Sequence, residues 1–329
     1  MTVYHKEVLF SMLQREFAFP SSDGKTDLHA VDWVPDSPVR AVLQISHGVS
    51  EYILRYQALA SFLTERGIAV AGHDHLGHGT SVSPGAPRLY FGPRGSWDFV
   101  EADLFARHQL VRQNFPDVPV FLMGHSMGSF LARTFLIRHP GAVEGAIIMG
   151  TGQPSSAVLT AGAFLMDREA RRKGTDTLPS TLAGRLSFAA YNRRFAPNRT
   201  DFDWLSRNLE NVDRYLTDPL CGGMPTTGLF REMLHGLSFL SHPQNLRQMD
   251  PGTPVLFLSG AMDPVGNMGK EVRHVCAQFR QAGVRDVTCK LYPQLRHEIL
   301  FETCRETVYS DLSQWLEARL PAVRKEAAR

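Results

Sequence analysis

The chain has 329 residues, about twice the length of a typical single domain, which is ample for a large buried core. With 43% apolar and 21% charged residues it has the composition of an ordinary globular protein, and no apolar stretch is long enough to span a bilayer. The 35 Lys and Arg against 33 Asp and Glu leave a net charge of only +2, whereas a dedicated nucleic-acid binder carries a basic surplus. We therefore expect neither a membrane-spanning protein nor a nucleic-acid partner.

The start of the chain and the cysteines indicate a reducing compartment. A short apolar patch from Val8 to Leu13 is followed by Arg15 and Glu16, and no small-residue cleavage site of a signal peptide follows it. The cysteines form no C-x-x-C pair, as a zinc ribbon or redox motif requires, and a disulfide framework is not expected in a chain this long. They are Cys221, Cys276, Cys289 and Cys304. We predict a cytoplasmic protein with buried, reduced thiols.

Short β-branched runs alternate with helix-length amphipathic segments, which is typical of a mostly parallel α/β sheet. The predicted strands are Leu28–Val34, Arg40–Ser46, Ile68–Ala71, Val120–Gly124, Gly145–Met149, Val255–Ser259 and Val287–Tyr292. The predicted helices are Tyr56–Glu65, Trp97–Asn114, Gly128–His139, Met268–Ala282 and Thr303–Leu320. From Gly152 to about Asn245 the alternation gives way to sequence with helical periodicity. We predict one α/β core, residues 1–151 and 246–329, with a helical insertion, residues 152–245.

The strongest motif is Gly124-His-Ser-Met-Gly128, a G-x-S-x-G. It follows the apolar run Val120–Met123 and precedes a helix-like segment, which is the strand–turn–helix context of a nucleophile elbow. Glycines are needed because the turn leaves no room for side chains near the serine. The helix N-terminus favours negative charge that develops there. Ser126 is therefore the candidate nucleophile.

A serine hydroxyl needs a base, and the base needs an acid that orients it. Asp263 and His297 each follow a late predicted strand, in the chain order that this architecture requires. Asp250 and Asp286 precede strands, so they are expected at the opposite edge of the sheet. Glu298 is too close to His297 in sequence to orient its ring. We predict Asp263 and His297 as the acid and the base.

The developing oxyanion needs backbone donors. One is expected at the N–H of Met127, directly after the nucleophile. The other is expected at the N–H of Val49, because His47-Gly48 ends an early strand and the glycine lets the loop approach the site. The alternative interpretation of His47-Gly48 is a plain glycine turn with a buried histidine.

The spacing His73-x-His75-x-x-His78 also raises the question of a metal site. Gly77 stands where dinuclear hydrolases of the H-x-H-x-D-H type have an aspartate, and a complete serine apparatus leaves a metal little to do. Asp74 and the neighbouring glycines are better interpreted as a tight loop after a strand. We expect no metal and no cofactor.

Three stretches together resemble the α/β-hydrolase superfamily and, within it, the monoacylglycerol lipase/lysophospholipase-like branch of the S33-type hydrolases. They are HGVSEYILRY at 47–56, similar to H-G-x-x-E-H-x-x-R-Y, DHLGHGTS at 74–81, similar to D-x-x-G-H-G-x-S, and the elbow G-H-S-M-G. The resemblance covers residues 17–320. It implies a mostly parallel central sheet flanked by helices, with a helical cap inserted after the sixth strand. Tyr52 departs from the pattern, which often has His there, and is expected at the pocket rim rather than in the triad.

The resemblance also implies that residues 152–245 form a cap over the active site. Ala157–Met166 has one polar residue in ten, and both packing inside the cap and contact with an acyl chain or a lipid surface fit this composition. From Gly152 to Thr200 eight basic residues face three acidic ones. This local charge of +5 favours either a solvated helical face or attraction to an anionic head group or interface.

Residues and resemblance together predict a serine hydrolase that cleaves carboxylic esters of lipid-like substrates, monoacylglycerol or lysophospholipid, through an acyl-enzyme. The expected partners are a small-molecule lipid or ester and, through the cap, the periphery of a membrane. A short-chain carboxylesterase, a thioesterase and an aminopeptidase are alternatives on the same triad, although the sequence places no acidic group to hold the amine of a peptide substrate. A non-catalytic ligand-binding protein with a hydrolase fold is an alternative of another class.

Overall fold

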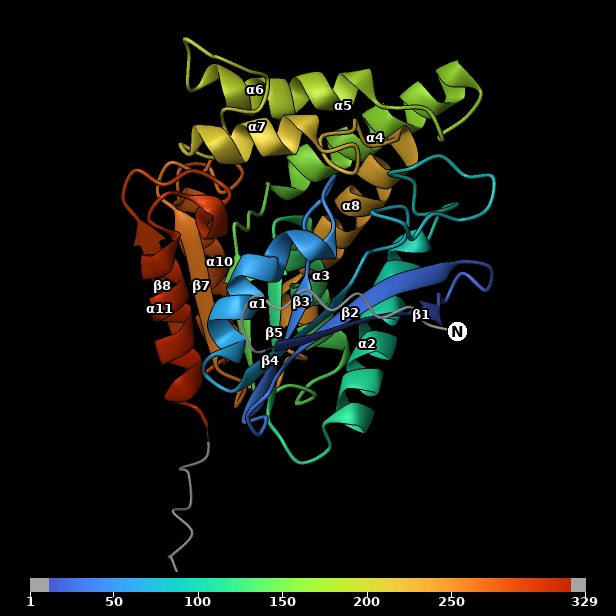
Figure 1. The fold of residues 1–329 in the computed structure, drawn as a ribbon. Coiled ribbons are helices and arrows are strands. Elements are labelled where there is room, and N and C mark those ends of the chain that lie inside the picture. Colours follow the sequence, from blue (N-terminus) through green and yellow to red (C-terminus); the bar gives the residue numbers. More distant parts are fainter. Residues whose placement is uncertain (1–11, 321–329) are drawn as a thin grey trace, which may run out of the picture.

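A central sheet of eight strands organises residues 12–320, the part of the chain that the computed structural model describes (Figure 1). Its order is β1-β2-β4-β3-β5-β6-β7-β8, and β4 to β8 run parallel, whereas β1 and β2 form an antiparallel edge. The strands are β1 Met12–Pro20, β2 Asp27–Pro35, β3 Ala41–Ser46, β4 Ile68–His73, β5 Val120–His125, β6 Gly145–Met149, β7 Val255–Gly260 and β8 Val287–Tyr292. This confirms the predicted mostly parallel α/β fold.

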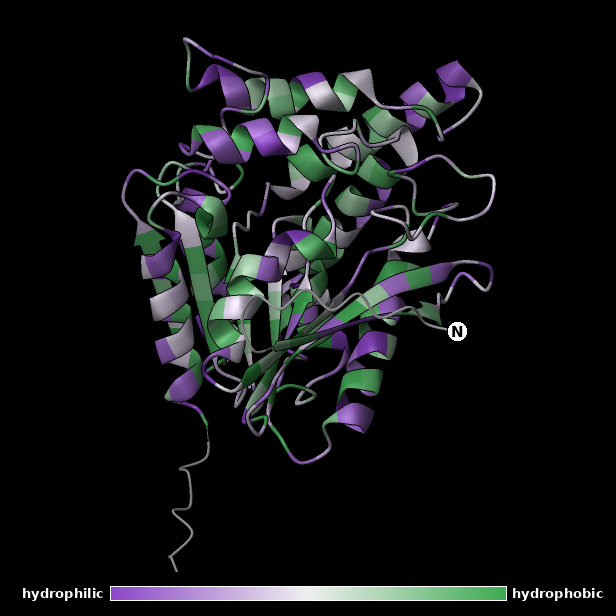
Figure 2. Cartoon of the chain, in the orientation of Figure 1, coloured by the Kyte–Doolittle hydropathy of each residue, from purple (hydrophilic) through white to green (hydrophobic). Residues whose placement is uncertain are grey.

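The central strands are apolar because both of their faces are covered. Every residue of β3, β4, β5, β6 and β7 is buried, as expected for parallel strands between two layers of helices. The hydrophobic colouring along these strands is visible in Figure 2. Met123 in the middle of β5 pairs with Ile45 of β3 and Ile147 of β6, so the sheet is in register where its core is densest.

Helices cover both faces of the sheet. One apolar cluster joins the sheet to α1 (Gln57–Thr64) and α11 (Arg305–Glu317). A second cluster joins the other face to α2 (Ser96–Asn114), α3 (Met127–Arg138) and α10 (Lys270–Gln281). These helices are the predicted ones, with ends that differ by at most three residues.

Between β6 and β7 the chain is helical, and this segment lies across the carboxyl ends of the parallel strands (Figure 1). Its helices are α4 Ser156–Lys173, α5 Thr181–Leu186, α6 Phe188–Arg193, α7 Leu209–Thr217, α8 Thr227–Leu240 and α9 Pro243–Leu246. α8 packs against both α3 of the core and α4. We refer to residues 152–245 as the cap. The fold thus has the expected helical cap after the sixth strand.

Two expectations were wrong. The sequence predicts no strand before Leu28, yet β1 pairs along its whole length with β2. Most side chains of β1 are exposed or half-buried, so its sequence shows no clear alternation of apolar and polar residues. Its backbone pairing with β2 holds it at the sheet edge, and for this reason the sequence does not reveal the strand. The thiols are free but not all buried, since Cys304 is exposed and Cys221 and Cys289 are half-buried.

Residues 1–11, which carry part of the signal-peptide argument, lie outside the described residues. Within residues 12–320, every helix is too short or too polar to cross a bilayer. The cytoplasmic location stays a prediction.

Candidate active site

The turn between β5 and α3 presents Ser126. Its backbone angles are φ 54° and ψ −120°, which is strained for any residue other than glycine. A Cβ atom on Gly124 would lie 2.2 Å from the main-chain oxygen of Gly128, and one on Gly128 would lie 2.0 Å from the main-chain oxygen of Ser46. The close approach of helix and strands therefore requires both motif glycines. The strained turn leaves the serine half-buried in the wall of a pocket.

The structure brings Asp263 and His297 together from the loops after β7 and β8. Oδ2 of Asp263 accepts a hydrogen bond of 3.0 Å from Nδ1 of His297, and both side chains are buried. The carboxylate also accepts hydrogen bonds from Oγ of Ser259, at 3.2 Å, and from the N–H of Val265, at 2.9 Å. Because the acid is held on both oxygens, it fixes the imidazole with its proton on Nδ1 and leaves Nε2 free to accept one.

Ser126 and His297 line the same pocket. Within residues 12–320 the Ser126 hydroxyl makes no hydrogen bond to the imidazole. Such bonds are often loose without substrate and tighten in the reacting complex. The three predicted side chains therefore share one site in which the acid–histidine contact is already formed.

Gly48 carries the oxyanion loop, residues 47–51, up to the serine. A Cβ atom on Gly48 would lie 3.1 Å from Cβ of Ser126. His47 Nδ1 donates to the carbonyl of Gly48, at 2.7 Å, and His47 Nε2 accepts the N–H of His75, at 2.9 Å. Burial lowers the pKa of His47, which suits this neutral tautomer. His47 is thus buried, as the plain-turn interpretation expects, and it also fixes the peptide after Gly48.

The two predicted oxyanion donors have no internal acceptor. The carbonyl and N–H of a trans peptide point in opposite directions, so the bond from His47 to the Gly48 carbonyl turns the N–H of Val49 away from His47. The N–H of Met127 belongs to the first turn of α3, where amides lack intrahelical acceptors. Neither N–H finds an acceptor within residues 12–320. Val49 lines the pocket, whereas Met127 is buried and is not among the residues that line it, so the role of these two N–H groups stays a prediction.

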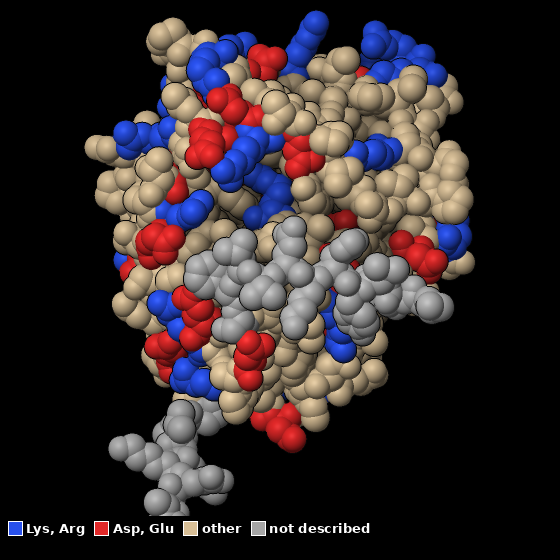
Figure 3. Space-filling model, viewed as in Figure 1, with Lys and Arg blue, Asp and Glu red and all other residues tan. Residues whose placement is uncertain are grey.

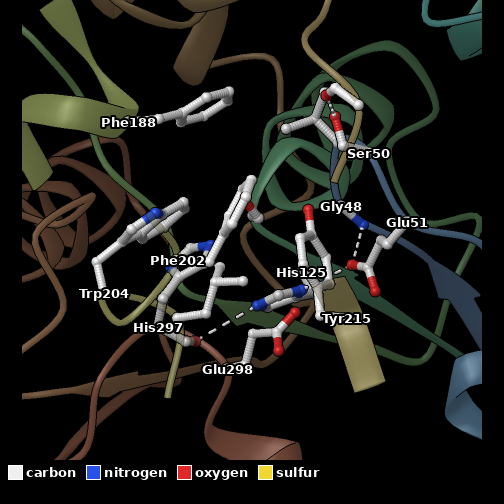
Figure 4. Close-up of a pocket in the computed structure, with 14 residues that line it drawn as sticks. Gly48, Ser50, Glu51, His125, Phe188, Phe202, Trp204, Tyr215, His297 and Glu298 are labelled. Carbon is white, nitrogen blue, oxygen red and sulfur yellow. Dashed lines mark hydrogen bonds and ion pairs between the residues drawn. The ribbon is translucent and has the colours of Figure 1, made fainter. Parts of the chain in front are cut away.

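Aromatic side chains from the cap close the pocket opposite the core loops (Figure 4). They are Phe188, Phe202, Trp204 and Tyr215. The ring of Trp204 lies 5.1 Å from that of His297, and Phe188 stacks on Trp204 at 5.8 Å. This wall suits an apolar group next to the reacting atoms.

Glu51, Arg55 and Glu298 are site residues that the sequence reasoning missed. Arg55 donates to both oxygens of Glu298, at 2.7 and 3.0 Å, and to Glu51, at 2.7 Å. Glu298 indeed does not orient the ring of His297, but its carboxylate is engaged beside it. The Glu and Arg of the H-G-x-x-E…R-Y motif could have indicated that Glu51 and Arg55 belong to the site.

Tyr52 is absent from the pocket lining, contrary to expectation. Its hydroxyl donates to Oδ2 of Asp218 in the cap, at 2.8 Å. Tyr52 therefore joins the core to the cap outside the pocket.

The three histidines of the H-x-H-x-x-H spacing are fully buried. Within residues 12–320 no three His, Cys, Asp or Glu side chains are arranged to hold a metal ion. Burial lowers the pKa of His73 and of His78 to about 3, so both rings are neutral. Asp74 accepts the N–H of Thr80, at 3.2 Å, within the loop after β4, and the N–H of Ile53, at 2.8 Å, from the 3₁₀ turn Ile53–Tyr56.

Comparisons with known proteins find a matching family and similar relatives. A family described as serine aminopeptidase, S33, matches residues 37–304. The monoglyceride lipase of Mus musculus is 26% identical over 294 residues, 88% of this chain and 86% of the relative. The monoacylglycerol lipase of Mycolicibacterium smegmatis is 27% identical over 321 residues, 95% of this chain and 100% of the relative.

Two solved structures show the same fold. A thermostable carboxyl esterase from Bacillus coagulans in complex with glycerol has a TM-score of 0.85 at 24% identity, covering 94% of this chain and 99% of the other. A soluble variant of monoglyceride lipase from Saccharomyces cerevisiae, in complex with a substrate analog, has a TM-score of 0.70 at 19% identity, covering 96% and 99%.

Proposed function

Because the chain belongs to the serine aminopeptidase S33 family and to its monoacylglycerol lipase-like branch of α/β-hydrolases, we propose that it is a serine hydrolase of lipid-like carboxylic esters. Monoacylglycerol or lysophospholipid is the proposed substrate. The observation that carries this is the 3.0 Å bond between Asp263 and His297 at the pocket where Ser126 stands on its strained turn. The names of the relatives point to the same substrate class.

In the proposed mechanism, Ser126 Oγ attacks the ester carbonyl while His297 Nε2 takes its proton. Asp263 holds the imidazole in the required tautomer and stabilises its cation. The N–H groups of Val49 and Met127 donate to the oxyanion. His297 then protonates the leaving alcohol, and a water molecule that it activates releases the acid from the acyl-enzyme.

The pocket lining favours an apolar ester over a peptide amine. Its two carboxylates outside the triad, Glu51 and Glu298, are already paired with Arg55. A substrate ammonium would have to compete with that guanidinium. The aromatic wall suits an acyl chain instead. A short-chain esterase and a thioesterase would use the same catalytic residues, so only a comparison of substrates distinguishes them from a lipid esterase.

We further propose that residues 152–200, the first half of the cap, contact an anionic lipid surface. Two of their eight basic side chains form ion pairs, Lys173 with Glu169 and Arg199 with Asp213. The others are exposed and have no carboxylate partner within residues 12–320: Arg168, Arg171, Arg172, Arg185, Arg193 and Arg194. Figure 3 shows basic side chains along this end of the molecule.

Apolar side chains are exposed on the same half of the cap. They are Val158, Phe164, Leu178 and Leu186, among nine large apolar side chains that are exposed within residues 12–320. Arginines beside exposed apolar groups are the combination that binds peripheral proteins to anionic bilayers. The bilayer is also where a lipid ester substrate would be found.

The test of the catalytic proposal is the variant Ser126→Ala. We expect it to fold but to lose both ester hydrolysis and labelling by a fluorophosphonate. A panel of p-nitrophenyl esters, acyl thioesters, monoacylglycerols, lysophospholipids and aminoacyl anilides should show a preference for the lipid esters. Retained labelling would refute the nucleophile, and a preference for anilides would refute the substrate class. Slow, near single-turnover hydrolysis with tight retention of the ligand would instead favour a binding protein.

A further inference from the structure

The carboxylate of Glu51 lies under the pocket and receives four hydrogen bonds. Oε1 accepts from the N–H of Gly48 at 2.6 Å, the hydroxyl of Tyr56 at 3.0 Å and Nδ1 of His125 at 3.1 Å. Oε2 accepts from Nη1 of Arg55 at 2.7 Å. A carboxylate offers about four lone-pair positions, so these donors engage both of its oxygens and hold the side chain in place. Glu51 thus lines the pocket with a carboxylate that the protein itself already engages.

The first contact reaches the oxyanion loop. The N–H of Gly48 is held by Glu51 and its carbonyl is held by His47, so the peptides on both sides of Gly48 are fixed. A Cβ atom on Gly48 would lie 2.6 Å from Oε1 of Glu51, which shows how tightly the carboxylate packs against this loop. The direction of the Val49 N–H therefore depends on His47 directly and on Glu51 through the preceding peptide.

The second contact reaches the nucleophile and the catalytic histidine. His125 directly precedes Ser126, and its Nε2 faces the main-chain oxygen of His297 at 3.4 Å (Figure 4). Both of its ring nitrogens thus face acceptors, which suits an imidazolium that donates twice. Burial opposes this charge, but the hydrogen bond and the charge of Glu51 raise the pKa of His125. Burial likewise opposes charge on Glu51, yet Arg55 and His125 hold the pKa of Glu51 well below its usual range.

The third contact, with Arg55, links Glu51 to the loop that carries His297. Arg55 bridges Glu51 and Glu298, the residue after His297. Its guanidinium lies 5.1 Å from the ring centre of Tyr215 in the cap and 4.4 Å from that of Phe301, and only 9% of its side chain is exposed. Such a buried pair is screened little by salt or water. Glu51 is therefore linked to the main chain of His297 through His125 and to the side chain of Glu298 through Arg55.

From these contacts we propose that Glu51 is a positioning residue, whose one carboxylate sets the Val49 N–H and the main chain of His297 relative to Ser126. This inference rests on the ester hydrolysis proposed above. Glu51 touches no reacting atom and acts through geometry alone. Its loss should lower kcat and leave substrate binding nearly unchanged.

The test is Glu51→Gln, which keeps the shape of the side chain and removes its charge. We expect kcat on a p-nitrophenyl ester to fall about 30- to 100-fold, with KM within about threefold, because a misplacement of about 1 Å costs a factor of this size. The matched control is Glu101→Gln. Glu101 is also buried and pairs with Arg138, at 3.0 Å, and His139, at 2.9 Å, between α2 and α3, away from the pocket. It should lower stability without changing kcat.

A second variant, His125→Asn, keeps a donor for Glu51 but does not reach the carbonyl of His297. We expect it to lower kcat about tenfold, and the double variant to lose less than the product of the two single losses, because both residues act along one path. If Glu51→Gln does not fold, the kcat of His125→Asn alone decides.

The inference is refuted if Glu51→Gln keeps wild-type kcat, if it raises KM alone, or if Glu101→Gln loses as much kcat. Failure of the proposed function has a different signature, since the wild-type protein would then show no hydrolysis that depends on Ser126.

Discussion

Charged side chains are paired and buried in the core beneath the pocket, whereas in the first half of the cap most of the basic ones are exposed and lack a carboxylate partner within residues 12–320. Under the pocket, Glu51, Arg55 and Glu298 are buried and paired with one another. On residues 152–200, six arginines are exposed without a carboxylate partner within residues 12–320, next to exposed apolar side chains. Buried, satisfied charges hold a geometry, whereas exposed, unpaired ones are available to something outside the molecule.

The second half of the cap belongs with the core in this comparison. The carbonyl of Leu205 accepts the N–H of Glu298, at 2.7 Å, and Asn208 donates to the carbonyl of Phe301, at 2.9 Å. Asn211 of α7 donates to Glu298, at 2.7 Å. These bonds tie the cap to the loop that carries His297, the proposed base. The second half of the cap is therefore bonded to the site, whereas the first half faces outward. The division between these two regions lies within the cap and not between the cap and the core.

The largest effect on the core side is expected for Asp263→Asn. The amide cannot hold the imidazole in the productive tautomer, so kcat should fall about 10⁴-fold while the fold persists. The measurement is steady-state kinetics on a p-nitrophenyl ester together with thermal unfolding. Asp250→Asn, which alters the acid that the sequence placed at the opposite sheet edge, is the control and should keep wild-type kcat. Equal losses in both variants would remove Asp263 from the triad.

On the cap side, the triple variant with Arg171, Arg172 and Arg193 changed to Gln should bind anionic vesicles about 100-fold more weakly. Each charge near such a surface contributes about 1 kcal/mol. The measurement is cosedimentation with phosphatidylserine-containing vesicles, and hydrolysis of a water-soluble ester should stay unchanged.

The control for this triple variant removes three exposed arginines that lie outside the cap, near the amino ends of β7 and β8: Arg247, Arg280 and Arg285. It should bind vesicles like the wild type. Equal weakening in both triple variants would mean that net charge alone, and not the first half of the cap, drives any binding.

A third prediction concerns basic side chains that are buried instead of exposed. The pKa of His73 lies at about 3 in the fold against an ordinary value of 6.5. Below pH 6.5 the unfolded chain takes up a proton that the folded chain refuses, so stability is lost as the pH falls from 6.5 toward 3, by about 1.4 kcal/mol per pH unit.

The variant that checks this is His73→Phe. Both ring nitrogens of His73 lack partners within residues 12–320, so stability at pH 7 should change by less than about 1 kcal/mol. Between pH 6 and 4 the variant should lose stability less steeply, by about 1.4 kcal/mol per pH unit. Urea unfolding at several pH values measures this slope. An unchanged slope would show that His73 is protonated in the folded protein.

The smallest effect is expected for Tyr52→Phe, which removes the hydrogen bond to Asp218 between core and cap. The bond is partly exposed, so we expect a loss of about 1 kcal/mol in the free energy of unfolding and less than a threefold change in kcat/KM. Urea unfolding and the substrate panel measure the two quantities. A changed substrate preference would place Tyr52 at the pocket rim after all.

Features that depend on the local order of residues could be predicted from the amino-acid sequence. The elbow could be identified because a strand, two glycines and a helix must follow one another for Ser126 to adopt its strained backbone. Asp263 and His297 could be chosen because parallel strands end at one sheet edge, so the residues after β7 and β8 had to meet there. The central strands could be predicted because burial on both faces makes them continuous apolar runs.

Which charges are paired and which face outward depends on how the chain packs in three dimensions. Arg55 and Glu298 are 243 positions apart, and no local pattern reveals that they meet. The same holds for β1, whose place depends on its pairing with β2. In the sequence, an arginine that lies under a pocket cannot be distinguished from one that lies on the surface. Its partner, burial and local dielectric set its role, and these are properties of the packed chain.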